Sequence, residues 1–393
     1  MRNRPTAVLL CAVLLITLLA LPAGAQTPSP TDTRSAGQVR GLTAEASAAD
    51  GATVSWRPPR GAAVDGYRLR IRAAIPRHAY QPDATEARVV GGDDISIDQA
   101  PWQVALGYVN RRHPVVPRGF SCGGTLIHPR WVLTAAHCID PDKPQLLRVA
   151  SGVDDLRAIG EEDLVGVVRI VMPRRGEDNL PPAPRGIIRD IALLELAEPA
   201  SGGVPIALDR SLRTFAGQEA FVSGWGSTRA VDPEGPERPM VVPRQLQGAR
   251  VAVSNGPGEP CDRLEEAVPG GYDERIQVCA SVDGRIDTCQ GDSGGPLVLR
   301  RGGSWVIGGI TSFGHGCALA GFPGVYVRVA AYRDWIVSHI PDLRWRVRNV
   351  GPDTTEVTVR RVTAGVRYRI VVEPRLAAGL GPRASLAVRA TVR

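Results

Sequence analysis

Short runs of alternating apolar and polar residues, separated by Gly and Pro turns, extend over most of the chain. Between residue 89 and about residue 340 these runs are rich in β-branched residues, and few segments have a helical period. That pattern predicts an all-β region of barrel or sandwich type, with one helix near its end in AAYRDWIVSHI. The same strand pattern occupies residues 38–75, around Trp56 and Tyr67, and it resumes in residues 343–393. The whole chain is therefore predicted to be all-β.

The first 25 residues have the pattern of a secretory signal peptide. Arg2 and Arg4 precede an apolar run at residues 7–21, and Ala23-Gly24-Ala25 follows it. A retained membrane anchor is the weaker interpretation, because the run is short and a small-residue cleavage site follows. We expect a secreted, extracellular protein with no membrane contact after signal cleavage. Residues 26–37, rich in Pro, Ser and Thr, are predicted to be a flexible leader.

Charge and cysteine content narrow the class further. The net charge of +7 comes almost wholly from arginine, since Lys143 is the only lysine. No basic run is interleaved with aromatic residues, so we interpret the charge as a solvated surface and expect no nucleic-acid partner.

Loss of the signal peptide removes Cys11 and leaves six cysteines, an even number that predicts disulfides in an exported protein. Six cysteines allow 15 pairings. No CxxC pair or histidine cluster supports a metal, and we expect no cofactor.

The stretch DTCQGDSGGPLV, residues 287–298, contains a candidate nucleophile, Ser293. A serine hydroxyl needs a base to take its proton, an acid to orient that base, and donors for the developing oxyanion. His137 ends the apolar run WVLTAAH, beside Cys138. Asp190 enters the apolar run IALLEL, where burial of its carboxylate would require a partner such as an imidazole N–H. Glycines around Ser293 permit a sharp turn in which backbone N–H groups converge.

Seven motifs occur in a fixed order along the chain. They are RVVGG (88–92), SCGGTLI (121–127), TAAHC (134–138), DIALLEL (190–196), GWG (224–226), GDSGGP (291–296) and TSFGHGC (311–317). Together they resemble the chymotrypsin/trypsin family of serine endopeptidases over residues 89–340. The resemblance implies two six-stranded β-barrels with the active site between them.

The resemblance also assigns roles to individual residues. His137 is the expected general base, Asp190 the residue that orients it, and Ser293 the nucleophile. The backbone N–H groups of Gly291 and Ser293 are the expected oxyanion hole. The implied disulfides are Cys122–Cys138, Cys261–Cys279 and Cys289–Cys317.

Asp287 lies six residues before Ser293, where trypsin-like members have an aspartate at the base of the specificity pocket. A substrate Arg or Lys would supply the partner that a buried carboxylate needs. The alternative for Asp287 is an acid in a loop that faces water. A protease with such an acid would cleave after apolar residues, which is the third hypothesis for the function. The other expected substrate-binding residues are Thr288, Ser312, Phe313, Gly314 and Gly324. Phe313 stands where a tryptophan is commoner, and Val153 stands at the first acid position of the family's calcium loop.

The motif at Arg88 resembles a zymogen activation site, within a linker at residues 76–88. Cleavage after Arg88 would free the amino group of Val89. In the family this ammonium pairs with the acid before the nucleophile, here Asp292. The oxyanion loop is therefore expected to become ordered only after cleavage.

The two flanks resemble the first and last strands of one fibronectin type III domain. The N-terminal flank carries VSW at residues 54–56 and GYRL at residues 66–69, and the C-terminal flank carries VTVRRVTAGVRYRIVVE at residues 357–373. Neither flank has enough strands to bury a core alone. We expect a β-sandwich made of residues 38–75 and 343–393, interrupted by the protease domain, with a protein or polysaccharide ligand. A propeptide followed by an unrelated tail is the alternative.

The predicted function is that of a secreted, trypsin-like serine endopeptidase made as a zymogen. It would cleave protein or peptide substrates after Arg or Lys through an acyl-enzyme. The alternative from another class is a secreted binding protein whose protease domain is vestigial. Reaction with an organophosphate serine probe separates the two, because only an activated Ser293 would be labelled.

Overall fold

The computed structural model describes residues 37–391 except 48, 50, 77, 79–89, 114–118, 175, 178, 183–188, 214–215, 237–238, 255–260, 262–263, 265–271 and 282. The predicted signal peptide, residues 26–36 of the leader and the Arg88–Val89 bond lie outside the described residues.

The first barrel is a closed antiparallel sheet with the strand order β10-β7-β6-β5-β8-β9. Its strands are β5 (Gln103–Tyr108), β6 (Cys122–His128), β7 (Trp131–Thr134), β8 (Leu147–Ser151), β9 (Leu164–Val171) and β10 (Ala192–Leu196). Successive side chains of a strand point to opposite faces, so β5 places Val104 and Leu106 in the barrel interior. Ala105, between them, packs into the core that the two barrels share.

The second barrel is built from six strands in the order β14-β17-β16-β15-β12-β13. They are β12 (Glu219–Gly224), β13 (Gln247–Ala252), β14 (Gln277–Ala280), β15 (Pro296–Arg301), β16 (Ser304–Phe313) and β17 (Gly324–Arg328); short β4 (Asp93–Asp94) and β11 (Ala207–Leu208) pair with β13 and β16. A bridge between Val253 and Ala280 joins the ends of β13 and β14. The double-barrel fold is therefore confirmed.

One α-helix, α2 (Val329–His339), follows the second barrel, at the place where the sequence predicts it. Its buried residues, including Tyr332 and Trp335, pack into the core shared by the barrels. The described 3-10 helices are η2 (Ile97–Gln99), η3 (Ala136–Cys138), η4 (Pro144–Leu146), η5 (Glu161–Asp163) and η7 (Pro341–Leu343). Within the described residues, no helix has the length and apolar character needed to cross a membrane.

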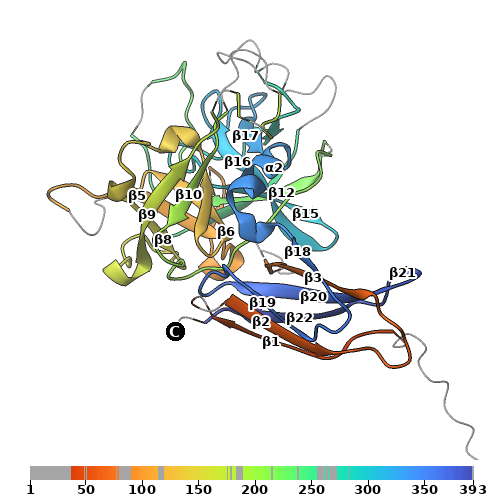
Figure 1. Cartoon of the computed structure of the whole chain (residues 1–393). Helices are drawn as coiled ribbons and strands as arrows, with labels where there is room; N and C mark the ends of the chain where they lie inside the picture. Colours follow the sequence, from red (N-terminus) through yellow and green to blue (C-terminus); the bar gives the residue numbers. More distant parts are fainter. Residues whose placement is uncertain are drawn as a thin grey trace, which may run out of the picture.

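The N-terminal and C-terminal flanks pair with each other in a two-sheet sandwich (Figure 1). One sheet has the order β1-β2-β19, and the other has β18-β3-β20-β21 with β22 paired to β20. The strands are β1 (Arg40–Ser47), β2 (Gly51–Arg57), β3 (Gly66–Ala73), β18 (Arg346–Val350), β19 (Glu356–Val359), β20 (Arg367–Leu376), β21 (Gly379–Leu380) and β22 (Ala384–Arg389). β3 is paired on both sides by C-terminal strands, since Ile71 faces Arg346 of β18 and Ile370 of β20.

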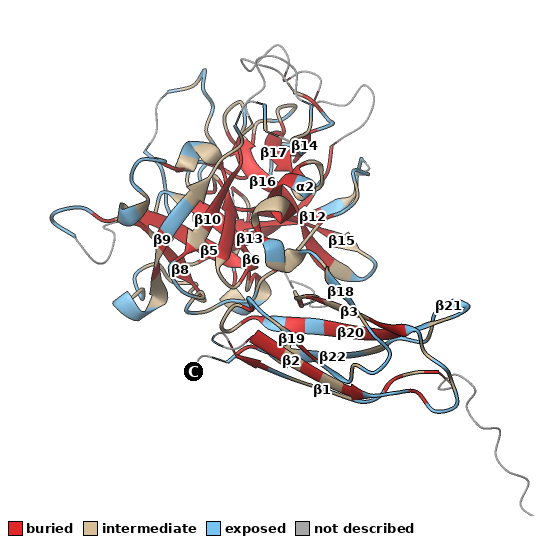
Figure 2. Ribbon diagram, viewed as in Figure 1, coloured by how far each residue is buried: buried red, intermediate tan, exposed pale blue. Residues whose placement is uncertain are grey.

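Both flanks supply the core of this sandwich (Figure 2). Trp56 and Tyr67 meet edge to face at 5.2 Å between ring centroids, and Tyr368 and Ile370 from the other flank belong to the same buried cluster. The double barrel is inserted between β3 and β18.

The sandwich contacts the double barrel through polar and aromatic side chains. Asp342, in η7, accepts hydrogen bonds from Tyr368 Oη at 2.6 Å and from Thr363 Oγ1 at 2.8 Å. Its Oδ2 lies 3.8 Å from Nε2 of buried His128 in β6. In the connection from β3 into the first barrel, the ring centroids of His78 and Trp102 lie 5.0 Å apart. The backbone of His78 forms a β-bridge with Trp305. The chain is thus attached to the barrel on both sides of the insertion.

Candidate active site

His137 and Asp190 are paired at the edge of the first barrel. η3 places His137 directly after β7, and Asp190 precedes β10, which is hydrogen-bonded to β7. The carboxylate of Asp190 accepts from the backbone N–H of His137 at 2.9 Å and lies 2.8 Å from its Nδ1. Asp190 is 5% exposed, whereas the His137 side chain is 45% exposed. A buried acid thus holds one ring nitrogen while the other side of the imidazole is open to a substrate.

The pKa of His137 is raised and the pKa of Asp190 is lowered, as expected for a base paired with an ionised acid. The hydrogen bond from His137 to Asp190 raises the pKa of His137, although burial of the ring opposes the rise. Burial alone would raise the pKa of Asp190, but the hydrogen bonds from His137 and Ser312 outweigh it and lower that pKa. The sequence assigned Ser312 to substrate binding, whereas its hydroxyl donates to Asp190 Oδ2. Ser312 is therefore a further partner of the acid.

Ser293 lies in a tight turn where the second barrel meets the first. Its carbonyl accepts from Gly123 N, in β6, at 2.8 Å. Gly291 has a φ of 100° and Gly294 a φ of 78°, conformations that L side chains rarely adopt. Neither the Gly291 nor the Ser293 amide donates a hydrogen bond to any residue in the described part of the chain. These two amides are therefore available to an oxyanion.

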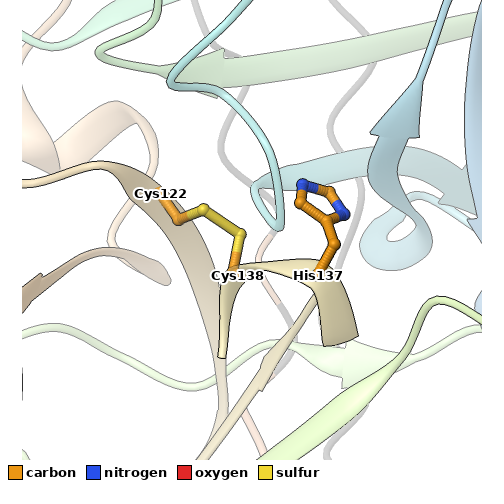
Figure 3. Close-up of side chains that lie close together, drawn as sticks. All are labelled: Cys122, His137 and Cys138. Atoms are coloured by element: carbon orange, nitrogen blue, oxygen red, sulfur yellow. A yellow bond between two sulfur atoms is a disulfide. The ribbon is translucent and has the colours of Figure 1, made fainter. Parts of the chain in front are cut away.

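A disulfide fixes the turn that carries His137 (Figure 3). Cys122 of β6 is bonded to Cys138, the residue after His137, and the predicted pairs Cys261–Cys279 and Cys289–Cys317 are also formed. Among the described residues, one group has ligand atoms close enough together to hold a metal ion: Cys122, His137 and Cys138. Because both sulfurs are in the disulfide, the group offers no thiolate, and we interpret it as support for the base.

Asp287 lies on the loop between β14 and β15 of the second barrel and is 2% exposed. Its Oδ2 accepts from Ala318 N at 3.0 Å, while its buried Oδ1 has no hydrogen-bond partner among the described residues. Burial raises the pKa of Asp287 to about 7, partly opposed by the Ala318 N–H. A Cβ atom added at Gly324 would lie 2.8 Å from Asp287 Oδ1. A Cβ atom added at Gly314 would lie 3.8 Å from the Cα of Gly324. A side chain at position 324 would therefore crowd this carboxylate oxygen, which glycine leaves clear.

Two other predicted pocket residues have defined contacts. The Thr288 hydroxyl is 3.0 Å from the Tyr326 hydroxyl beside Asp287. Phe313, half-buried at the end of β16, packs against the cluster around Cys279 and Val325. Ser312 and Phe313 thus lie on β16, Gly314 directly follows it, Gly324 begins β17, and Thr288 shares the loop of Asp287.

Asp292, the acid before Ser293, is buried behind the same loop. Its carboxylate accepts from Gly226 N at 2.8 Å and from Cys289 N at 2.9 Å. Burial raises its pKa to about 6, although both backbone donors oppose the rise. Val90 is also buried, and its carbonyl accepts from Asp287 N at 3.2 Å. Val90, which follows the predicted activation site, therefore lies beside the backbone of Asp287.

A double β-barrel with a histidine–aspartate pair on one barrel and a glycine-flanked serine on the other defines the class of chymotrypsin-like proteins. A family model described as Trypsin matches residues 89–336. Transmembrane protease serine 9 of Rattus norvegicus is 35% identical over 270 residues, which cover 68% of this chain and 23% of the relative. The chain belongs to the trypsin family of serine proteases. It spans less than a quarter of the length of that relative.

Proposed function

We propose that the chain is an endopeptidase that hydrolyses peptide bonds after Arg or Lys, with His137, Asp190 and Ser293 as its catalytic residues. The observation that carries the specificity is Asp287, a buried carboxylate with an oxygen that has no partner among the described residues. An unpaired buried charge costs free energy that a guanidinium or ammonium in the pocket would offset.

In this proposal each of these groups has one role in acylation. His137 Nε2 removes the proton of the Ser293 hydroxyl as Oγ attacks the substrate carbonyl carbon. The Gly291 and Ser293 amides donate to the oxyanion that forms. His137 then gives its proton to the leaving amine, the C–N bond breaks, and the acyl group remains on Ser293.

Deacylation repeats the steps with water. His137 takes a proton from water as the oxygen attacks the ester carbon, and it returns that proton to Ser293 Oγ as the ester bond breaks. Asp190 stays ionised throughout and stabilises the imidazolium, which agrees with its lowered pKa. No metal or redox group takes part in this sequence of steps.

A substrate panel tests the proposal. Protein whose N-terminus has been confirmed as Val89 should hydrolyse peptide amides ending in Arg or Lys and leave those ending in Phe or Ala intact. Initial rates measure this, and labelling by an organophosphate probe reports Ser293 independently of the pocket. Hydrolysis after Phe or Ala alone would keep the nucleophile and contradict the role of Asp287. Absence of both turnover and labelling would favour the alternative of a binding protein with a vestigial protease domain.

We also propose that the chain is exported and made as a zymogen cleaved after Arg88. Export is supported by the N-terminal signal pattern and by three disulfides. Activation is supported by the buried carboxylate of Asp292, whose hydrogen-bond donors among the described residues are two backbone amides. The Val89 ammonium, one residue before buried Val90, would supply the missing cation.

We propose that the sandwich is a single fibronectin type III-like domain interrupted by the protease. The support is its sheet order and the hydrogen bond from Thr363 N to Tyr368 Oη at 2.7 Å, which resembles the tyrosine corner of such sandwiches. No cysteine lies in residues 38–75 or 343–393, so only non-covalent contacts would retain the N-terminal piece after cleavage.

Cleavage at Arg88 is therefore expected to leave residues 26–88 bound. β3 is hydrogen-bonded on both sides by β18 and β20, and Trp56 and Tyr67 lie in the shared core. Gel filtration of the cleaved protein without denaturant should give one peak that contains both pieces, and urea should separate them. Two peaks in native buffer would contradict the split-domain proposal.

A further inference from the structure

A groove of about 820 Å³ lies at the junction of the sandwich and the double barrel. The described residues of its walls include five arginines and one acid: Arg72, Arg210, Arg301, Arg333, Arg369 and Asp209. The chain as a whole has 47 Lys and Arg against 40 Asp and Glu, so the bias of the groove is not a consequence of overall composition. The groove is separate from the site above, since none of the residues proposed for catalysis or specificity lines it.

Asp209, the acid among the described lining residues, is already neutralised. Arg301 donates to both carboxylate oxygens of Asp209, at 2.8 to 3.2 Å, and Asp209 is 3% exposed. Arg333 pairs with its exposed neighbour Asp334. Arg72, Arg210 and Arg369 have no ion pair with any residue that the structure describes. Three uncompensated guanidinium groups therefore remain in the groove.

These arginines come from distant parts of the sequence and repel one another. Arg72 of β3 faces Arg369 of β20 directly across the antiparallel pair, a like-charge placement that destabilises a sheet. Burial lowers the pKa of Arg72, and repulsion by Arg210, Arg369, Arg333 and Arg70 lowers it further. Arg72 is held in this position because its guanidinium lies 4.5 Å from the Trp345 ring centroid. Nearby Glu373 pairs with Arg70 instead.

We propose that this groove binds an oligoanion that carries several sulfate or phosphate groups. Guanidinium groups bind such oxyanions through paired N–H donors. A phosphate or sulfate presents at least three acceptor oxygens and can join guanidiniums from separate elements, whereas a carboxylate has two. The groove volume lies within the roughly 300–1,000 Å³ of small-molecule sites, which exceeds the needs of a single inorganic anion. The ligand would join the sandwich and the protease, because each contributes arginines.

Arg369→Thr is the decisive variant, and Arg375→Thr is its matched control. Both residues are exposed on β20, but Arg375 is six positions further along, about 20 Å away, and it does not line the groove. Ser293→Ala in every protein prevents self-cleavage. Calorimetric titration at low ionic strength with tripolyphosphate and with a heparin-derived hexasaccharide should show binding, weakened about tenfold by Arg369→Thr and unchanged by Arg375→Thr.

The unliganded variants separate a ligand site from a structural role. Without an anion, Arg369→Thr should raise the melting temperature, because it removes the repulsion with Arg72. Binding of only one probe supports the proposal and identifies phosphate or sulfate as the group recognised. The proposal would be overturned if neither probe binds the wild-type groove or if both variants weaken binding equally. It would also be overturned if unliganded Arg369→Thr has a lower melting temperature than wild type, or if oligoglutamate binds more tightly than the probes.

Discussion

Replacement of Asp287 by asparagine is expected to lower kcat/KM for Arg and Lys substrates about 10³-fold. The substrate cation would enter a buried pocket without an opposing charge, and breaking such a pair costs about 3–5 kcal/mol, where each 1.36 kcal/mol is a factor of ten in rate. Steady-state hydrolysis of the Arg and Lys peptide amides measures the loss. The rate of organophosphate labelling should stay near the wild-type value, because Asp287 does not contact the reacting atoms in this proposal. An equal loss of labelling would show that the substitution disturbs Ser293 instead.

The same substitution should change the pH dependence of stability. The folded protein keeps Asp287 protonated up to about pH 7, whereas the unfolded chain releases that proton near about pH 4. Stability is therefore highest below the unfolded pKa and falls as the pH rises through this window. Asparagine carries no titrating proton, so the unliganded variant should be more stable than wild type at pH 8 and similar at pH 4. Denaturant unfolding in the Ser293→Ala background measures both.

The motifs give candidate site residues directly from the sequence because each motif is local. TAAHC, DIALLEL and GDSGGP place their chemistry within a few residues, so the spacing along the chain identifies His137, Asp190 and Ser293 as candidates. The double barrel and the three disulfides follow from the resemblance that these motifs carry, whereas helix α2 was predicted from the residue pattern AAYRDWIVSHI. The activation bond could be predicted in the same way, although Arg88 and Val89 lie outside the described residues.

Contacts between distant residues were harder to predict. The Ser312 hydroxyl reaches Asp190 across 122 positions, and no local pattern distinguishes that serine from one that lines the pocket. The strand pattern indicated β-structure in both flanks, but the placement of β3 between β18 and β20 depends on pairing across the whole inserted domain. The arginine groove was not found from sequence, because its arginines belong to separate elements, including β3, β15, α2 and β20, and gather only where the two domains meet.

Replacement of Asp190 by asparagine is expected to lower kcat about 10⁴-fold, as in other proteases with a Ser-His-Asp arrangement. Asp190 accepts from the His137 backbone, from the His137 ring and from Ser312. An amide can accept fewer of these bonds and presents an N–H to the ring, which favours the wrong imidazole tautomer. Asp140→Asn is the matched control, since this partly exposed acid is three residues from His137 and pairs with Lys143.

The pH profile shows whether Asp190 acts through His137. The carboxylate raises the pKa of His137, so the acid limb of kcat/KM in the wild type should have its midpoint above the ordinary histidine value of about 6.5. Activity is lost as the pH falls through this midpoint, because the protonated ring cannot take the Ser293 proton. Asp190→Asn removes the stabilising charge, so its residual activity should persist to lower pH. A large loss of kcat with an unchanged acid limb would mean that Asp190 supports the fold of the turn rather than the base.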